Sequence, residues 1–123
     1  MEFRFNNSMP IWQQLANQIT ESIVTGEYSP GERFPAVREL AMQADVNPNT
    51  MQRALAKLED QGLLVTARTA GRTVTEDQAI LQETRKRIAE WKTADYMEGM
   101  KKLGYSREEA AAWAAGFGKE GEI

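Results

Sequence analysis

The order of the predicted elements constrains the fold of this chain more than any single motif. Apolar residues recur at helical spacing in three stretches, residues 10–26, 35–44 and 48–62, each opened by a proline. Two β-type runs follow at residues 63–66 and 72–75, separated by a short stretch of small and polar residues. Helix, short helix, turn, helix and hairpin within about 70 residues is the plan of a winged helix-turn-helix. We therefore predict an α-rich fold with a small two-stranded wing.

The third helix is the best-marked element. Asn47 can cap its first turn, Pro48 suits the first helical position, and Gly62 can close it in a left-handed conformation. Apolar residues at three- and four-residue spacing predict the buried face, which consists of Met51, Ala54, Leu55 and Leu58. The opposite side then carries Asn49, Gln52 and Arg53, with Thr50 and Lys57 on the flanks.

This exposed side fits a DNA-reading role. In a winged helix-turn-helix the third helix enters the major groove, where its side chains must donate and accept hydrogen bonds at base edges. The predicted groove contacts are Asn49, Thr50, Gln52, Arg53 and Lys57. Basic residues on the second helix and on the wing can neutralise phosphates on either side, and these are Arg38, Arg68 and Arg72.

Each of these side chains also has an ordinary structural interpretation. Arg38 could form a surface ion pair with Glu32, Glu39 or Asp45. The polar residues of the third helix could be a solvated face, and the wing arginines could be hairpin charges without a role. The position on a third helix and beside it favours DNA contact for the helix and wing residues, and the motif around Arg38, described below, favours it there.

Composition limits the function classes. The sequence has no cysteine and no histidine, which removes thiolate and imidazole catalysis and the usual zinc sites, so we expect neither an enzyme nor a bound metal or cofactor. The net charge of −3 is unusual for a DNA-binding protein, although residues 33–75 carry a net +2. The acidic balance leaves open a winged helix that binds protein instead of DNA. No membrane span or targeting segment is recognisable, so we expect a cytoplasmic protein.

Residues 77–123 are predicted to form a helical dimerisation segment, separate from the DNA-binding domain at residues 1–76. Capping-box spacing at Thr75 and Ser106 predicts one long helix and one short helix. Two helices of this size cannot bury several large apolar residues between themselves, and a symmetric partner is the commonest cover. The predicted dimer contacts are Ile88, Trp91, Trp113 and Phe117. Two alternatives stay open: these residues could pack on the DNA-binding domain of the same chain, or they could line a pocket for a small-molecule effector, whose identity the sequence does not indicate.

Two segments resemble a known family of bacterial transcription regulators. Residues 30–41 contain a proline-glycine turn and Arg38, and residues 46–55 contain Asn-Pro-Asn-Thr at the start of the third helix. In this spacing they resemble the DNA-binding domain of the GntR family, and the short helical remainder is similar to the YtrA-like subfamily. The resemblance implies a homodimeric repressor of the kind that often controls transporter genes. It also implies DNA contacts at Arg38, Asn49, Thr50, Gln52 and Arg53, and at the wing by Gly71.

The sequence departs from the family pattern at the recognition helix and at the wing. Several relatives have arginine where Pro48 and Gln52 stand, which predicts a preference for a different operator. Many relatives also have a Gly-x-Gly wing tip, whereas here Thr69 takes the first position and Gly71 the second.

Overall fold

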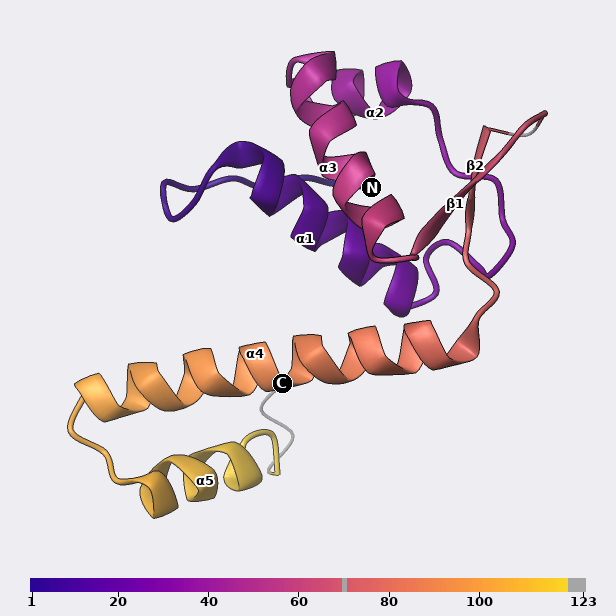
Figure 1. The fold of residues 1–123 in the computed structure, drawn as a ribbon. Coiled ribbons are helices and arrows are strands. Elements are labelled where there is room, and N and C mark those ends of the chain that lie inside the picture. Colours follow the sequence, from indigo (N-terminus) through magenta and orange to yellow (C-terminus); the bar gives the residue numbers. More distant parts are fainter. Residues whose placement is uncertain (70, 120–123) are drawn as a thin grey trace. The chain divides into compact units, whose positions relative to one another are not determined.

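The structure, a computed structural model, describes residues 1–69 and 71–119 of the chain. It forms two compact units, Met1–Arg85 and Lys86–Ile123, which we name the head unit and the tail unit (Figure 1). The elements are α1 (Ile11–Val24), α2 (Val37–Ala44), α3 (Pro48–Asp60), β1 (Leu64–Ala67), β2 (Gly71–Val74), α4 (Gln78–Lys102) and α5 (Arg107–Gly116). The predicted α-rich fold with a two-stranded wing is confirmed. Among the described residues, no helix combines the length and the hydrophobicity needed to span a bilayer.

The core of the head unit lies among α1, α2 and α3. α1 packs against α3, and α2 packs against α3 (Figure 1). Leu15 and Ile19, one turn apart on α1, are fully buried, as is Leu40 of α2. The four residues predicted as the buried face of α3 are all 0% exposed: Met51, Ala54, Leu55 and Leu58. A fully buried Met or Leu side chain stabilises the fold by roughly 1.5–3 kcal/mol, so this face fixes the rotation of α3 and exposes the opposite one.

Two glutamines of α1 hold the extended N-terminal segment. The Gln14 amide accepts from the Asn6 N–H at 3.0 Å and donates to the Asn6 carbonyl at 2.9 Å. Gln18 makes the same reciprocal pair with Arg4, at 3.0 and 2.7 Å. Arg4 and Asn6 are two residues apart in an extended segment, and Gln14 and Gln18 are four residues apart in a helix. Both separations correspond to a rise of roughly 6 Å, so both hydrogen-bonded pairs can form at once.

A tight turn joins α2 to α3. Asp45 has a left-handed backbone, φ 54°, which aspartate adopts more readily than most residues because its short side chain can hydrogen-bond locally. The Val46 N–H donates to the Ala41 carbonyl at 3.0 Å and closes α2. Asn47 caps α3 by accepting from the Asn49 N–H at 2.7 Å. The predicted start of the third helix is confirmed.

β1 and β2 form the predicted wing. They are antiparallel, with Leu64 opposite Val74 at the base and Ala67 opposite Gly71 at the tip. Residues 31–34 run along the other edge of β2, to which they are joined by three backbone hydrogen bonds of 2.8–2.9 Å. This extra strip ties the wing to the segment that leads into α2.

The cap of α4 differs from the prediction. The carboxylate of Asp77 accepts from the N–H groups of Ala79 at 2.9 Å and Ile80 at 3.3 Å. The hydroxyl oxygen of Thr75 instead accepts from the Asp77 N–H at 3.1 Å. The predicted capping role of Thr75 is therefore wrong, because Asp77 lies closer to the first helical turn and its carboxylate reaches two free amides.

The tail unit is a helical hairpin made by the later part of α4 and by α5. The predicted capping box at the start of α5 is present, with Ser106 and Glu109 bonding each other reciprocally. Hydrogen bonds from Ser106, first of all its backbone N–H, lower the pKa of Glu109. The Tyr96 hydroxyl donates to the carbonyl of Ala110 at 2.8 Å, and Ala110 is buried.

The two units divide after Arg85, later than the predicted domain boundary after Glu76. Ile80 and Leu81 explain the difference, since both pack against the head core. The first turns of α4 therefore belong structurally to the head unit, and the functional division at residue 76 stays a prediction.

Candidate DNA interface

The face of α3 opposite the core is open to solvent. Asn49, Gln52, Arg53 and Lys57 are exposed, and Thr50 is half-buried. All five residues predicted on this face therefore lie outside the core. Figure 1 shows that the N-terminal end of α3 stands beside α2.

Arg53 is held in place by an aromatic ring. Its guanidinium carbon lies 4.2 Å from the centroid of the Trp12 ring on α1. A cation over an indole face is attracted by the ring electrons, by about 0.5–1 kcal/mol at an exposed site. The contact also restricts the Arg53 rotamers, so the guanidinium is oriented in the free protein. Periodicity does not reveal this pair, because the two residues lie on different helices.

Arg72 of β2 is turned toward α3. Its Nε donates to Oε1 of Glu59, and its Nη2 donates to Oε1 of Gln52 at 3.3 Å. The Arg72 side chain is only 18% exposed. The sequence suggested a free wing charge, whereas the structure gives Arg72 partners on α3 and brings it together with Gln52.

Glu59 links the last turn of α3 to both strands of the wing. Its Oε2 accepts from the Thr66 hydroxyl at 2.9 Å, while Oε1 accepts from Arg72. The hydrogen bond from Arg72 is the main reason that the pKa of Glu59 lies below its ordinary value of 4.5, although partial burial acts in the opposite direction. Sequence reasoning missed Glu59, which carries no signal beyond its place near the end of the helix.

The lowered pKa of Glu59 predicts a pH-dependent contribution to stability. A carboxylate whose pKa is lower in the folded state stabilises the fold above its unfolded-state pKa, and that stabilisation is lost as the pH falls through the folded-state value. We expect Glu59→Gln to lower the free energy of unfolding by about 0.5–1 kcal/mol at neutral pH, as for a partly exposed pair. The difference from the wild type should shrink below about pH 4.

Thermal unfolding followed by circular dichroism across this pH range measures the difference. Glu90→Gln removes an exposed carboxylate of α4 and serves as the control. A destabilisation by Glu59→Gln that stays constant down to acid pH would show that ionised Glu59 is not the stabilising form.

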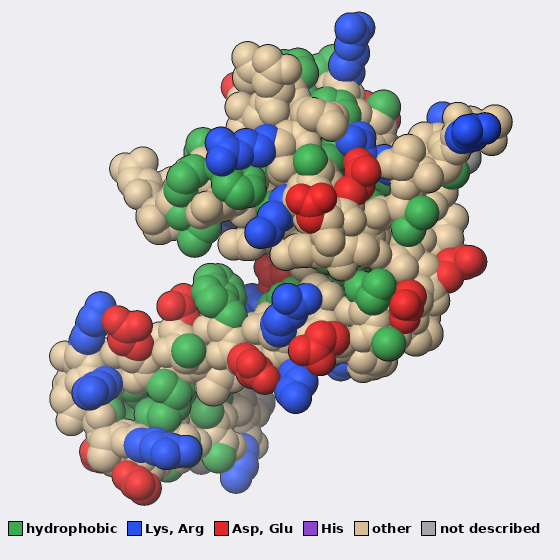
Figure 2. Space-filling view, viewed as in Figure 1, with side chains coloured by type: hydrophobic (Ala, Val, Ile, Leu, Met, Phe, Trp, Pro, Cys, Tyr) green, Lys and Arg blue, Asp and Glu red, His purple; other side chains and the backbone are tan. Residues whose placement is uncertain are grey.

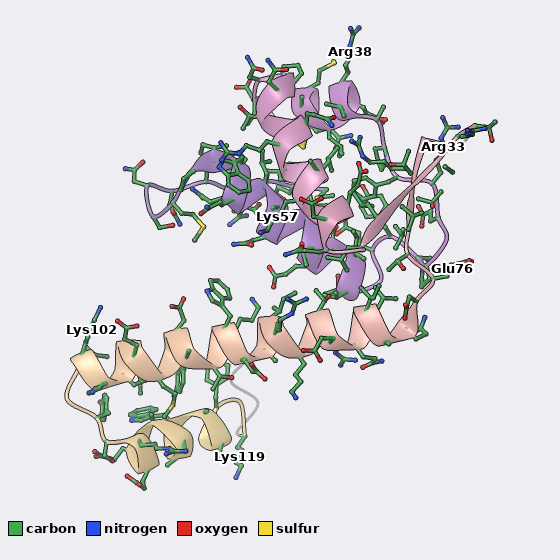
Figure 3. The ribbon with its side chains drawn as sticks, viewed as in Figure 1. Arg33, Arg38, Lys57, Glu76, Lys102 and Lys119 are labelled. Carbon is green, nitrogen blue, oxygen red and sulfur yellow. The ribbon has the colours of Figure 1, made fainter. Side chains whose placement is uncertain are left out.

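Arg38 on α2 and Arg68 on the hairpin are exposed cations. Among the residues that the structure describes, neither has a carboxylate within ion-pair distance. The alternative in which Arg38 pairs with Glu32, Glu39 or Asp45 is therefore absent from this structure. Figure 3 shows Arg38 extending from α2 away from the head unit, and Figure 2 shows basic side chains at the α2 end and at the hairpin tip.

Gly71 begins β2 with a left-handed backbone, φ 68°. A side chain at this φ would be strained, even though no atom lies within 4 Å of the position that a Cβ would take. The turn itself therefore requires glycine. The DNA contact that the family resemblance implies for Gly71 stays a prediction.

The large aromatic residues of the tail unit are uncovered. Trp91, Trp113 and Phe117 are 51%, 58% and 72% exposed. Ile88 is half-buried, and the Trp113 ring meets Tyr105 edge-on, with 6.1 Å between centroids. A depression of about 670 Å³ elsewhere on the tail unit is lined by Met97, Glu98, Lys101, Tyr105, Ser106, Arg107 and Ala110. None of the four predicted dimer contacts lines that depression.

These features define a class of protein. A third helix with an open hydrogen-bonding face, a hairpin anchored beside it and flanking arginines without an ion-pair partner among the described residues are the parts of a DNA-binding winged helix-turn-helix. Comparison with known proteins agrees: residues 11–74 match the model of the bacterial regulatory proteins of the gntR family. The chain belongs to the GntR family, which confirms the resemblance seen in the sequence.

Relatives match the chain beyond the winged helix. An uncharacterized HTH-type transcriptional regulator of Bacillus subtilis (strain 168), YhcF, is 37% identical over 89% of this chain and 90% of its own length. The HTH-type transcriptional repressor YtrA of the same organism is 38% identical over 58% of this chain and 55% of its own length. A solved GntR family transcriptional regulator from Listeria monocytogenes is 39% identical, with a TM-score of 0.80 over 90% of this chain and 97% of its own. The chain is a DNA-binding transcription regulator and not an enzyme.

Proposed function

We propose that the chain is a homodimeric repressor that binds a palindromic operator with the exposed face of α3 in the major groove. The observation that carries the proposal is the composition of this face. Asn49, Gln52 and Arg53 offer both donors and acceptors to base edges. Arg38 on α2 and Arg68 on the wing, both without an ion-pair partner among the described residues, are available to phosphates on either side.

The uncovered aromatic residues of the tail unit support the homodimer. Trp91, Trp113 and Phe117 are each more than half exposed, although large apolar side chains gain free energy when they leave water. A second copy of the chain offers the same apolar surface and can cover it by twofold symmetry. Two linked head units would then present their recognition helices about one turn of DNA apart, roughly 34 Å.

Repression is supported by the relationship to YtrA, which is named a transcriptional repressor. A dimer that occupies both half-sites of an operator excludes other proteins from the same stretch of DNA. No chemical step is required, in keeping with a chain that lacks histidine and cysteine.

Arg38 provides a test of the proposed interface. We expect Arg38→Ala to weaken binding to the operator and to unrelated duplex DNA by similar factors, because a phosphate contact carries no sequence information. The slope of log affinity against log salt concentration should fall by about one. Fluorescence anisotropy with labelled duplexes at several salt concentrations measures both quantities.

Arg107→Ala removes the same charge from the start of α5 and should leave the salt slope unchanged. An unchanged slope for Arg38→Ala would contradict its role as a phosphate contact. A wild-type chain that binds the operator no better than unrelated duplex DNA would contradict sequence reading by α3.

A further inference from the structure

The side-chain amide of Gln52 is held in one orientation by the wing. Nη2 of Arg72 lies 3.3 Å from Oε1 of Gln52, while Nε of Arg72 donates to Glu59. A guanidinium has only donors, so the amide atom that faces Arg72 must be the oxygen. Nε2 of Gln52, with its two N–H donors, therefore points away from Arg72. The oxygen and nitrogen ends of an amide have almost the same shape, so the orientation is assigned from the hydrogen-bond partner and not from the shape.

Glu59 keeps Arg72 in the position that orients Gln52. Both oxygens of the Glu59 carboxylate are engaged, Oε1 by Arg72 and Oε2 by the Thr66 hydroxyl at 2.9 Å. Side chains from both strands of the wing thus hold the carboxylate, and the Arg72 side chain is only 18% exposed. A partly buried, paired guanidinium changes rotamer less readily than a free one, so the orientation of Gln52 persists in the free protein.

The orientation of the amide decides which base Gln52 can read. A glutamine that reads adenine uses both ends of its amide, with the oxygen accepting from N6 and the nitrogen donating to N7. Here the oxygen is turned toward the wing, and the nitrogen offers only donors. Guanine presents two acceptors in the major groove, O6 and N7, whereas adenine and thymine each present one acceptor and cytosine presents a donor that would face the Gln52 donors.

We propose that Gln52 reads a guanine in each half-site of the operator, and that Glu59 and Arg72 are the positioning residues that set this preference. The proposal rests on the proposed function, since it requires α3 to enter the major groove. It assigns Arg72 to specificity instead of to phosphate binding. It also predicts that the preference can be changed without altering any residue that touches DNA.

The test is selection of bound sequences from a random duplex pool by the full-length chain. Comparing the wild type with Gln52→Ala identifies the base pair that Gln52 reads, because preference is lost at that pair alone. We expect guanine at that pair, favoured over adenine by roughly tenfold. Arg72→Met keeps much of the side-chain length but removes the donors, so the amide can rotate and adenine should become about as good as guanine.

Arg68→Met is the matched control, since it removes a charge from the same hairpin outside the Glu59–Arg72 pair. It should weaken binding to all sequences without changing the base preference. Glu59→Gln is the milder second variant and should reduce the guanine preference in the same direction as Arg72→Met. If Arg72→Met fails to fold, as circular dichroism would reveal, the Glu59→Gln result and the wild-type preference still decide the matter.

Adenine, thymine, cytosine or no preference at the pair read by Gln52 would overturn the proposal. So would a guanine preference that is unchanged in Arg72→Met or in Glu59→Gln. A wild-type chain that enriches no sequence would overturn the proposed function as well, and this distinguishes the two failures.

Discussion

A chain shortened to residues 1–85 should bind its operator about 10²- to 10⁴-fold more weakly than the full-length chain. The head unit retains its core, including the contacts of Ile80 and Leu81, so this cut spares the fold better than a cut after Glu76 would. The expected loss comes from linkage: once one head of a dimer is bound, the second head meets its half-site at a high effective concentration. A monomeric head has no such advantage.

Light scattering and anisotropy with operator DNA test this expectation together. The full-length chain should have the mass of a dimer, and the 1–85 fragment that of a monomer. The double variant Trp113→Ala, Phe117→Ala keeps the whole chain but removes two exposed aromatics, and it should shift the mass and the affinity in the same direction. Equal affinities for fragment and full-length chain would contradict the role of the tail unit in dimerisation.

The second large effect is expected at Arg53. Replacing it with alanine should weaken operator binding by about 1–3 kcal/mol and relax the preference at one base pair, because a bidentate arginine contact to a base is lost. The fold should be unaffected, since Arg53 is exposed and its contact with Trp12 contributes only about 0.5–1 kcal/mol.

Arg53→Lys separates base reading from simple charge. A lysine keeps the positive charge but lacks the planar fork that contacts two acceptors at once. If Arg53 reads a base, the lysine variant should lose specificity nearly as much as the alanine variant; if Arg53 only neutralises a phosphate, lysine should restore binding to all sequences. Trp12→Leu should cause a smaller loss, because Arg53 would remain but lose its orientation.

Local signals in the sequence were sufficient to predict most of the head unit. The start of α3 follows from Asn47 as cap, and its buried face follows from apolar spacing around Leu55. The wing follows from two β-type runs that are separated by only a short stretch of small and polar residues. These features depend on residues close together in the sequence, where capping and periodicity act strongly.

The contacts that position the site could not be predicted in this way. Arg72 and Gln52 are 20 residues apart, and their contact depends on how the wing twists beside α3. The stacking of Arg53 on Trp12 similarly requires the packing of α1 against α3. Net charge was also misleading, since a chain of net charge −3 belongs to a DNA-binding family.

Base-resolution footprinting of the full-length chain on a DNA site selected by the wild type tests whether a homodimer reads its operator with α3. We expect two protected half-sites related by twofold symmetry, with centres about 10 base pairs apart and contacts in the major groove. The triple variant Asn49→Ala, Gln52→Ala, Arg53→Ala should retain weak, salt-dependent binding but lose the footprint. A single unsymmetrical footprint, or one that the triple variant leaves unchanged, would contradict operator recognition by α3 in a homodimer.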